Sequence, residues 1–181
     1  VALMELTIEQ TLQQGVVAHK EGKLKDAERL YRTILRSQPL HPDANHNLGV
    51  LAVSVNKADE ALPLFKTALD ANPKIEQFWL SYIDALIKEK KFDNANKVIK
   101  EGKKQGIDRK KLDFLGSPLA LLEHYKSGRF GEAEKLAMSI TQEFPKHKLG
   151  WKVLGAIFGQ TGRISEALIA NEKAVALSPQ E

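Results

Sequence analysis

The segment PDANHNLGVLAVSVNKADEALPLFKTALDANP, residues 42–73, decides the fold of this chain. Apolar residues fill two blocks, and Asn56 lies between them, where a left-handed turn residue is easily accommodated. Gly49 and Ala61 are small enough to let two helices cross closely. Pro73 lacks the amide needed to continue the second helix, so it ends the segment. The segment therefore predicts an antiparallel helical hairpin.

Prolines recur at the same phase along the chain, at Pro39, Pro73, Pro145 and Pro179. Two of the gaps between them are 34 residues, and the middle gap of 72 equals 34 plus 38. A fixed period of this length is the signature of a helical-repeat array. The sequence therefore predicts five repeats, which start at Ile8, Pro42, Glu76, Phe114 and Lys148.

The repeat resembles the tetratricopeptide repeat, whose pattern is W-x2-L-G-x2-Y, then A-x3-F, then P over about 34 residues. Repeat one carries Gly15, Ala18, Ala27, Tyr31 and Pro39. Repeat two carries Leu48, Gly49, Ala52, Ala61, Phe65, Ala68 and Pro73, and repeat five carries Trp151, Leu154, Gly155, Phe158, Ala167, Ala174 and Pro179. Repeats three and four are weaker copies, because Ile83 and Leu121 replace the glycine. The resemblance implies an all-α fold, a right-handed α-solenoid of about five antiparallel helix-turn-helix repeats.

The repeat boundaries divide the chain into four parts. Residues 1–7 are an N-terminal extension, in which we expect Val1 to Leu3 to be a cloning remnant ahead of a natural start at Met4. Residues 8–107 hold repeats one to three, and residues 114–181 hold repeats four and five. Residues 108–113 are predicted to be an irregular connector, because the period lengthens by four residues here. We expect a longer loop, through Ser117, and hinge motion at this connector.

Local signals predict where several helices begin and turn. Thr7 and Gln10 fit a capping box at the start of the first helix. Gly22, Gly128 and Gly162 fall at the tight turns inside their hairpins, where Asn56 serves repeat two. Lys90 stands at this position in repeat three, where a lysine adopts a left-handed turn only at a cost.

Composition limits the classes of function. The chain has 181 residues, 43% of them hydrophobic and 28% charged, with no apolar run long enough for a membrane span. Since the N-terminus also lacks a basic stretch followed by a signal-type apolar block, we expect a soluble cytoplasmic protein. The absence of cysteine excludes disulfides. The net charge is +4, but the densest basic stretch, Lys100 to Lys111, has no interleaved aromatic residues for base stacking. A nucleic-acid partner is therefore not favoured.

The sequence contains none of the arrangements that enzymes and metal sites require. Its five histidines show no H-E-x-x-H spacing, and residues 102–106 lack the order of a phosphate-binding loop. We therefore expect no enzyme activity, cofactor or metal in this segment.

The resemblance implies that the first helix of each hairpin lines an inner groove. The residues at the groove positions are Leu12, Val16, His19, His46, Asn47, Val50, Val53, Leu80, Asp84 and Ile87. The alternative is that Val16, Val50, Leu80 and Ile87 only pack against neighbouring helices. Some relatives bind an acidic peptide terminus with a clamp of lysine, arginine and asparagine side chains. At clamp positions this chain has Leu12, Val16, Gln77 and Ser81 instead, and only Asn47 matches the clamp pattern. We therefore expect a peptide with apolar anchors, extended or helical, near Asn47.

The sequence is compatible with three functions. The leading hypothesis is a module that binds a protein or peptide, as the recruiting part of a larger bacterial protein with a transferase domain downstream. The alternative is an RNA-binding helical repeat of the pentatricopeptide kind. The third is a self-associating scaffold. We expect that the sequence is cut from a longer array and that the apolar outer face of repeat five, which includes Leu168, Val175 and Leu177, is partly exposed and associates with a second copy.

Overall fold

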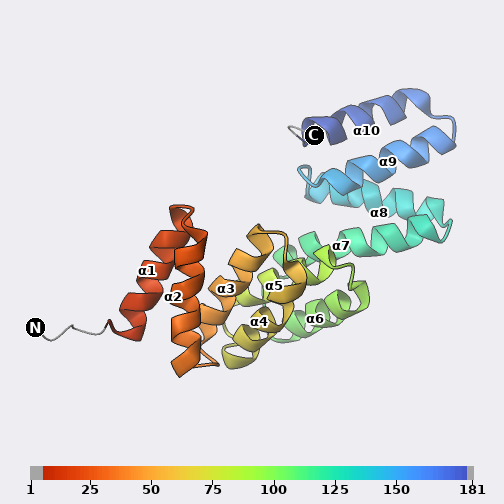
Figure 1. Cartoon of the computed structure of the whole chain (residues 1–181). Coiled ribbons are helices and arrows are strands. Elements are labelled where there is room, and N and C mark those ends of the chain that lie inside the picture. The colour runs from red at the N-terminus through yellow and green to blue at the C-terminus, as the bar shows by residue number, and fades with distance from the viewer. Residues whose placement is uncertain (1–5, 179–181) are drawn as a thin grey trace, which may run out of the picture. The chain divides into compact units, whose positions relative to one another are not determined.

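The computed structural model describes residues 6–178, which are almost entirely helical (Figure 1). The chain divides into two compact units, Val1–Asp108 and Arg109–Glu181. The N-terminal unit contains α1 (Ile8–Lys20), α2 (Leu24–Ser37), α3 (Pro42–Ser54), α4 (Ala58–Ala71), α5 (Glu76–Lys88) and α6 (Phe92–Lys104). The C-terminal unit contains α7 (Arg109–Lys126), α8 (Phe130–Glu143), α9 (Lys148–Gln160) and α10 (Ile164–Ala176). These helices pair into five successive hairpins, which confirms the all-α repeat fold. The proposed cloning remnant, Met4 and Pro179 lie outside the described residues.

Small residues and left-handed turns close the hairpins. The first-helix start is capped as predicted, since the Gln10 amide donates to Thr7 Oγ1 at 3.1 Å and the Thr7 amide donates to Gln10 Oε1 at 3.0 Å. Gly22, Gly128 and Gly162 have positive φ angles, and so does Asn56. Lys90 also adopts this conformation, with φ of 56°, although a Cβ atom is unfavourable there.

The helices of a hairpin cross where the repeat has its glycine. A Cβ atom on Gly49 would lie 2.6 Å from Phe65 Cε1, and one on Gly15 would lie 2.6 Å from Tyr31 Cε1. The two rings are almost fully buried, so they occupy the space that the glycines leave. Glycine at these crossings is therefore required by packing, as the sequence predicts.

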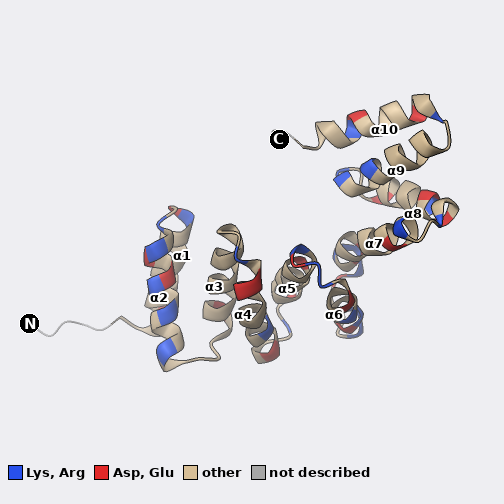
Figure 2. Ribbon diagram, turned by 45° about the vertical axis from the view of Figure 1, so that its right-hand side comes forward, with Lys and Arg blue, Asp and Glu red and all other residues tan. Residues whose placement is uncertain are grey.

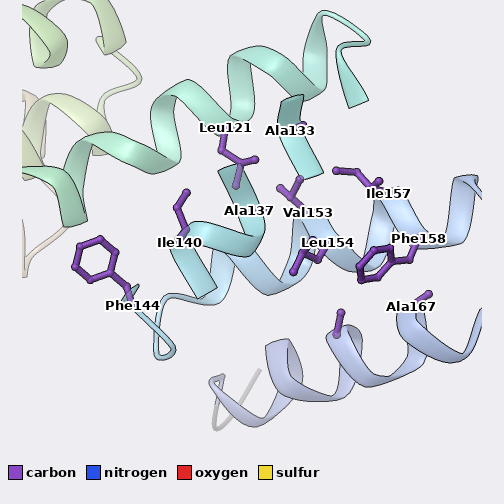
Figure 3. Close-up of a cluster of buried hydrophobic side chains, with 11 residues drawn as sticks. Leu121, Ala133, Ala137, Ile140, Phe144, Val153, Leu154, Ile157, Phe158 and Ala167 are labelled. Atoms are coloured by element: carbon purple, nitrogen blue, oxygen red, sulfur yellow. The ribbon is translucent and has the colours of Figure 1, made fainter. Parts of the chain in front are cut away.

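Repeat four solves the same crossing with the sizes exchanged. Leu121 of α7 occupies the glycine position and Ala137 of α8 occupies the position of the aromatic ring. Both are fully buried in one core cluster, where Figure 3 shows the Leu121 side chain directed toward α8. The large residue has moved to the first helix and the small one to the second.

The first helix of a hairpin is fastened to the proline that ends the hairpin before it. Trp79 Nε1 donates to the Pro73 carbonyl at 2.9 Å, and Trp151 Nε1 donates to the Pro145 carbonyl at 2.9 Å. In repeat two the corresponding residue is Asn45, and its Nδ2 donates to the Pro39 carbonyl at 2.9 Å. A position read as aromatic packing thus also carries a recurring hydrogen bond between successive hairpins.

The irregular connector predicted at residues 108–113 is wrong. Helix α7 begins at Arg109, so it takes up five residues of this stretch and runs 18 residues in all. Leu112 is fully buried, and burial of this side chain holds the extra turn in helical conformation. The helix also continues through Pro118, which removes only one amide from its hydrogen-bond pattern. The loop predicted through Ser117 is therefore wrong as well. The basic residues between Lys100 and Lys111 lie in α6 and α7 and not in an irregular connector.

No helix within residues 6–178 combines the length and the apolar character that crossing a membrane requires.

Candidate partner-binding groove

The ten residues predicted for the groove all lie in the N-terminal unit, on its three first helices. Helix α1 carries Leu12, Val16 and His19, helix α3 carries His46, Asn47, Val50 and Val53, and helix α5 carries Leu80, Asp84 and Ile87. Nine of these side chains are partly exposed, and His46 is buried, with 9% of its surface exposed.

Helix α3 differs in charge from the helices of the outer layer. Figure 2 shows α2 banded with acidic and basic residues, whereas α3 is almost wholly uncharged. Asp43 is its one charged residue. A weakly charged helix with partly exposed valines is suited to contact an apolar partner surface.

His46 is the centre of a polar network that links α3 to α5. Its Nε2 atom lies 2.9 Å from Ser81 Oγ, and its Nδ1 atom lies 3.3 Å from Asn47 Oδ1. Gln77 Nε2 in turn donates to Ser81 Oγ at 3.1 Å. The network therefore fixes the side chains of Asn47 and Ser81 on two successive first helices.

Aromatic rings hold the His46 imidazole in place. Its ring centroid lies 5.5 Å from that of Phe65 on α4 and 4.8 Å from that of Phe78 on α5. Burial lowers the pKa of His46, and the hydrogen bond to Asn47 Oδ1 and the charge of Asp43 oppose this shift only in part. The imidazole is thus held in its neutral form between the two rings.

Asn47 has one polar atom to offer a partner. Its Oδ1 atom faces His46, while Nδ2 has no hydrogen-bond partner among the described residues. An amide donor without a partner in the fold can donate a hydrogen bond to a carbonyl oxygen.

Other predicted residues do not join this network. Leu12 packs against the core cluster around Tyr31. The His19 ring lies 6.5 Å from Tyr31 on α2, and Asp84 forms an ion pair with Lys88 at 3.0 Å. Val16, Val50, Val53, Leu80 and Ile87 remain partly exposed along the three helices.

Two features of this unit were not predicted from the sequence. Phe78 was not assigned a role, although its ring lies beside that of His46, 32 residues earlier in the sequence. An open pocket of ≈ 560 Å³ also lies between α4 and α6, with Trp79 and Tyr82 among its lining residues. This pocket contains none of the predicted groove residues. Among residues 6–178 there is no cluster of three or more His, Asp or Glu that could hold a metal ion.

A family model of the tetratricopeptide repeat matches residues 12–54, 46–106 and 120–181, which together cover most of the chain. The chain belongs to the tetratricopeptide repeat family. The human protein O-mannosyl-transferase TMTC3 is 24% identical to it over 168 residues, which is 90% of this chain and 18% of that protein. The chain thus spans under a fifth of the length of this relative.

Solved tetratricopeptide structures share the fold. YrrB, described as a TPR protein with an unusual peptide-binding site, has a TM-score of 0.68 at 17% identity and covers 97% of this chain and 88% of its own. MamA has a TM-score of 0.68 at 13% identity, over 94% of this chain and 91% of its own. PilF of Pseudomonas aeruginosa has a TM-score of 0.66 at 13% identity, over 96% and 78%. At these identities the likeness shows the fold alone.

Proposed function

We propose that the N-terminal unit of this tetratricopeptide array binds an extended segment of a partner polypeptide across α1, α3 and α5. The observation that carries the proposal is the His46 network, which fixes Asn47 with its Nδ2 donor free beside the partly exposed Val50 and Leu80. The valine and leucine side chains supply apolar anchors, and the asparagine supplies one oriented hydrogen bond. This is a binding role without catalysis.

Peptide selection on the purified chain tests this function. A displayed library of random peptides supplies ligands, and isothermal titration calorimetry then measures their Kd for the wild-type chain and its variants. We expect Asn47→Ala to weaken binding about fivefold, the loss of one hydrogen bond, and Val50→Glu to weaken it further. Asn94→Ala, an exposed asparagine of α6, is the matched control and should bind as wild type does.

Two results would contradict the groove. The first is equal affinity of Asn47→Ala and wild type for the selected peptides, with unchanged melting temperature. The second is tight binding of labelled single-stranded RNA that falls steeply with salt, which would favour the RNA-binding alternative.

The likeness to a much longer transferase supports a second proposal, on the setting of the array. We infer that it acts as the recruiting part of a larger protein that carries a transferase domain, as expected for many arrays of this kind, and that it works in the cytoplasm. The complete open reading frame tests this, because a reading frame without any catalytic domain would contradict it.

Helix α10 supports self-association as a further binding mode. Ile164, Leu168 and Val175 lie along one face of α10 and are 67%, 60% and 72% exposed, and Figure 2 shows most of α10 without charge. The same repeat positions in α4 hold Ala58, Leu62 and Leu69, which are buried. We infer that this stripe, Ile164–Leu168–Val175, packs against the stripe of a second copy.

The outer face of α1 is a poorer match for this stripe. Gln14 occupies the repeat position where α3 and α9 have the buried Leu48 and Leu154. Stacking of α10 on α1 of a second copy would therefore place glutamine against leucine, and α10 against α10 is favoured. On α10, Ala167 and Ala174 are buried, whereas Leu168 and Val175 are exposed.

Light scattering over a concentration series tests self-association. We expect the wild-type chain to dimerise and both Leu168→Glu and Val175→Glu to remain monomeric. Ser165→Glu adds the same charge to an exposed position outside the stripe and should still dimerise. A wild-type chain that stays monomeric at high concentration would contradict the inference.

A further inference from the structure

A basic pocket of ≈ 430 Å³ lies in the C-terminal unit, far along the sequence from the groove. It is lined by Phe114 of α7 and by Lys146, His147, Lys148, Leu149 and Lys152 at the start of α9. The lining includes three lysines and no carboxylate. Within residues 6–178 none of these three ammonium groups has an ion pair or a hydrogen bond. Their charges are therefore available to a ligand.

His147 leaves the N-terminal end of α9 uncapped. In repeat two, His41 stands at the same position, and its Nδ1 atom accepts a hydrogen bond from the Ala44 amide at 3.2 Å. No side chain caps α9, and Nδ1 of His147 is buried without a partner. The amides of the first turn of α9 are thus left to solvent or to a ligand, at the positive end of the helix dipole.

An aromatic contact explains why His147 does not cap its helix. The His147 ring centroid lies 4.9 Å from that of Phe114, which also packs edge-on against Phe144 at 5.1 Å. Phe114 remains 39% exposed while it does so. The pocket therefore combines an apolar wall with a cluster of uncompensated positive charge.

We propose that this pocket binds an oxyanion, a phosphate or a carboxylate, carried by a side chain of a partner polypeptide. The lysines supply the attraction, and the amides of the first turn of α9, which no side chain caps, add hydrogen-bond donors. Phe114 contacts the apolar part of the neighbouring residue of the ligand. The basic residues gather in one pocket beside a single exposed ring, which suits one anionic side chain better than a nucleic-acid strand.

Three labelled peptides test the proposal on the full chain. They share a Leu-X-Leu core, with X as phosphoserine, glutamate or serine, so they separate a phosphate from a carboxylate source. Binding is followed by the backbone amide NMR signals of Leu149 and Gly150, which lie in the first turn of α9. We expect one or both anionic peptides to shift these signals and to bind at least tenfold more tightly than the serine peptide. Their affinity should fall steeply between about 50 and about 300 mM salt, because added salt screens the attraction between the lysines and the anionic side chain.

Matched lysine variants locate the site. Lys152→Ala should weaken the anionic peptide about fivefold to tenfold, whereas Lys135→Ala, an exposed lysine of α8 outside the pocket, should leave it unchanged. Asn47→Ala should also leave it unchanged, so this result is independent of the groove.

Three outcomes would overturn the proposal. They are equal binding of the three peptides, equal effects of Lys152→Ala and Lys135→Ala, and tenfold tighter binding of a single-stranded oligonucleotide than of either anionic peptide.

Discussion

His46 Nε2 and Ser81 Oγ lie 2.9 Å apart, although the two residues are 35 positions apart in the sequence and belong to different hairpins. The bond joins α3 to α5, and both of these helices carry proposed peptide contacts. It therefore couples the position of Asn47 to the stacking of repeats two and three.

Removal of the Ser81 hydroxyl should lower stability. Ser81→Ala leaves the partly buried Nε2 atom of His46 without its partner, so we expect the free energy of unfolding to fall by about 1 kcal/mol. Urea denaturation followed by circular dichroism measures this. Ser139→Ala removes an exposed hydroxyl of α8 that makes no hydrogen bond and should change stability very little. Equal effects of the two substitutions would show that the bond to His46 contributes nothing.

Gly49→Leu should overpack the crossing of α3 and α4. Its first added atom would meet the buried Phe65 ring at 2.6 Å, so we expect a loss of about 1–3 kcal/mol and a melting temperature lower by several degrees. Gly159→Leu is the matched control, because no atom lies within 4 Å of a Cβ atom added there. Thermal unfolding of the two variants should differ clearly. A stable Gly49→Leu protein would mean that Phe65 can move aside.

Lys90→Gly should stabilise the protein. Lys90 has a φ of 56°, a conformation that costs a residue with a Cβ atom roughly 1 kcal/mol and costs glycine almost nothing. Part of this gain is offset by the greater freedom of glycine in the unfolded chain. Lys91→Gly changes the next residue, whose φ is −88°, and should bring no gain. A rise in the urea midpoint for Lys91→Gly but not for Lys90→Gly would contradict the strain argument.

Stability should fall below about pH 6.5, the ordinary pKa of a histidine in an unfolded chain. Burial lowers the pKa of both His46 and His147 in the folded chain. As the pH falls, these histidines therefore take up protons in the unfolded chain before they do so in the folded chain. The stabilisation from these neutral imidazoles is complete above the unfolded pKa and is lost as the pH falls toward the folded values. Urea midpoints at pH 7.5 and 5.0 measure the loss. His46→Gln cannot titrate at this position and should reduce the difference between the two midpoints.

The periodic residues determined the fold from the sequence alone. Gly15 and Gly49 predicted close helix crossings, and Gly22, Gly128 and Gly162 predicted left-handed turns, all as found. These features depend on short-range backbone geometry and on the size of one residue, so a repeated residue type is sufficient to indicate them.

Helix α7 marks where local signals were insufficient. The lengthened period and the sequence Gly116-Ser117-Pro118 predicted a loop, whereas Arg109–Lys126 is helical. Burial of Leu112 favours the helix there, and burial depends on neighbours that the local sequence does not reveal.

Only the tertiary structure decided how the histidines are used. His41 and His147 occupy the same repeat position, but His41 caps its helix and His147 turns toward Phe114. His46 reaches a serine in the next hairpin, and a periodic pattern fixes neither that rotamer nor that partner. Sequence thus determined which residues face each crossing and turn. The choice of polar partner came from the packing of one hairpin against the next, because hydrogen bonds require atoms within about 3 Å and only the folded chain brings them that close.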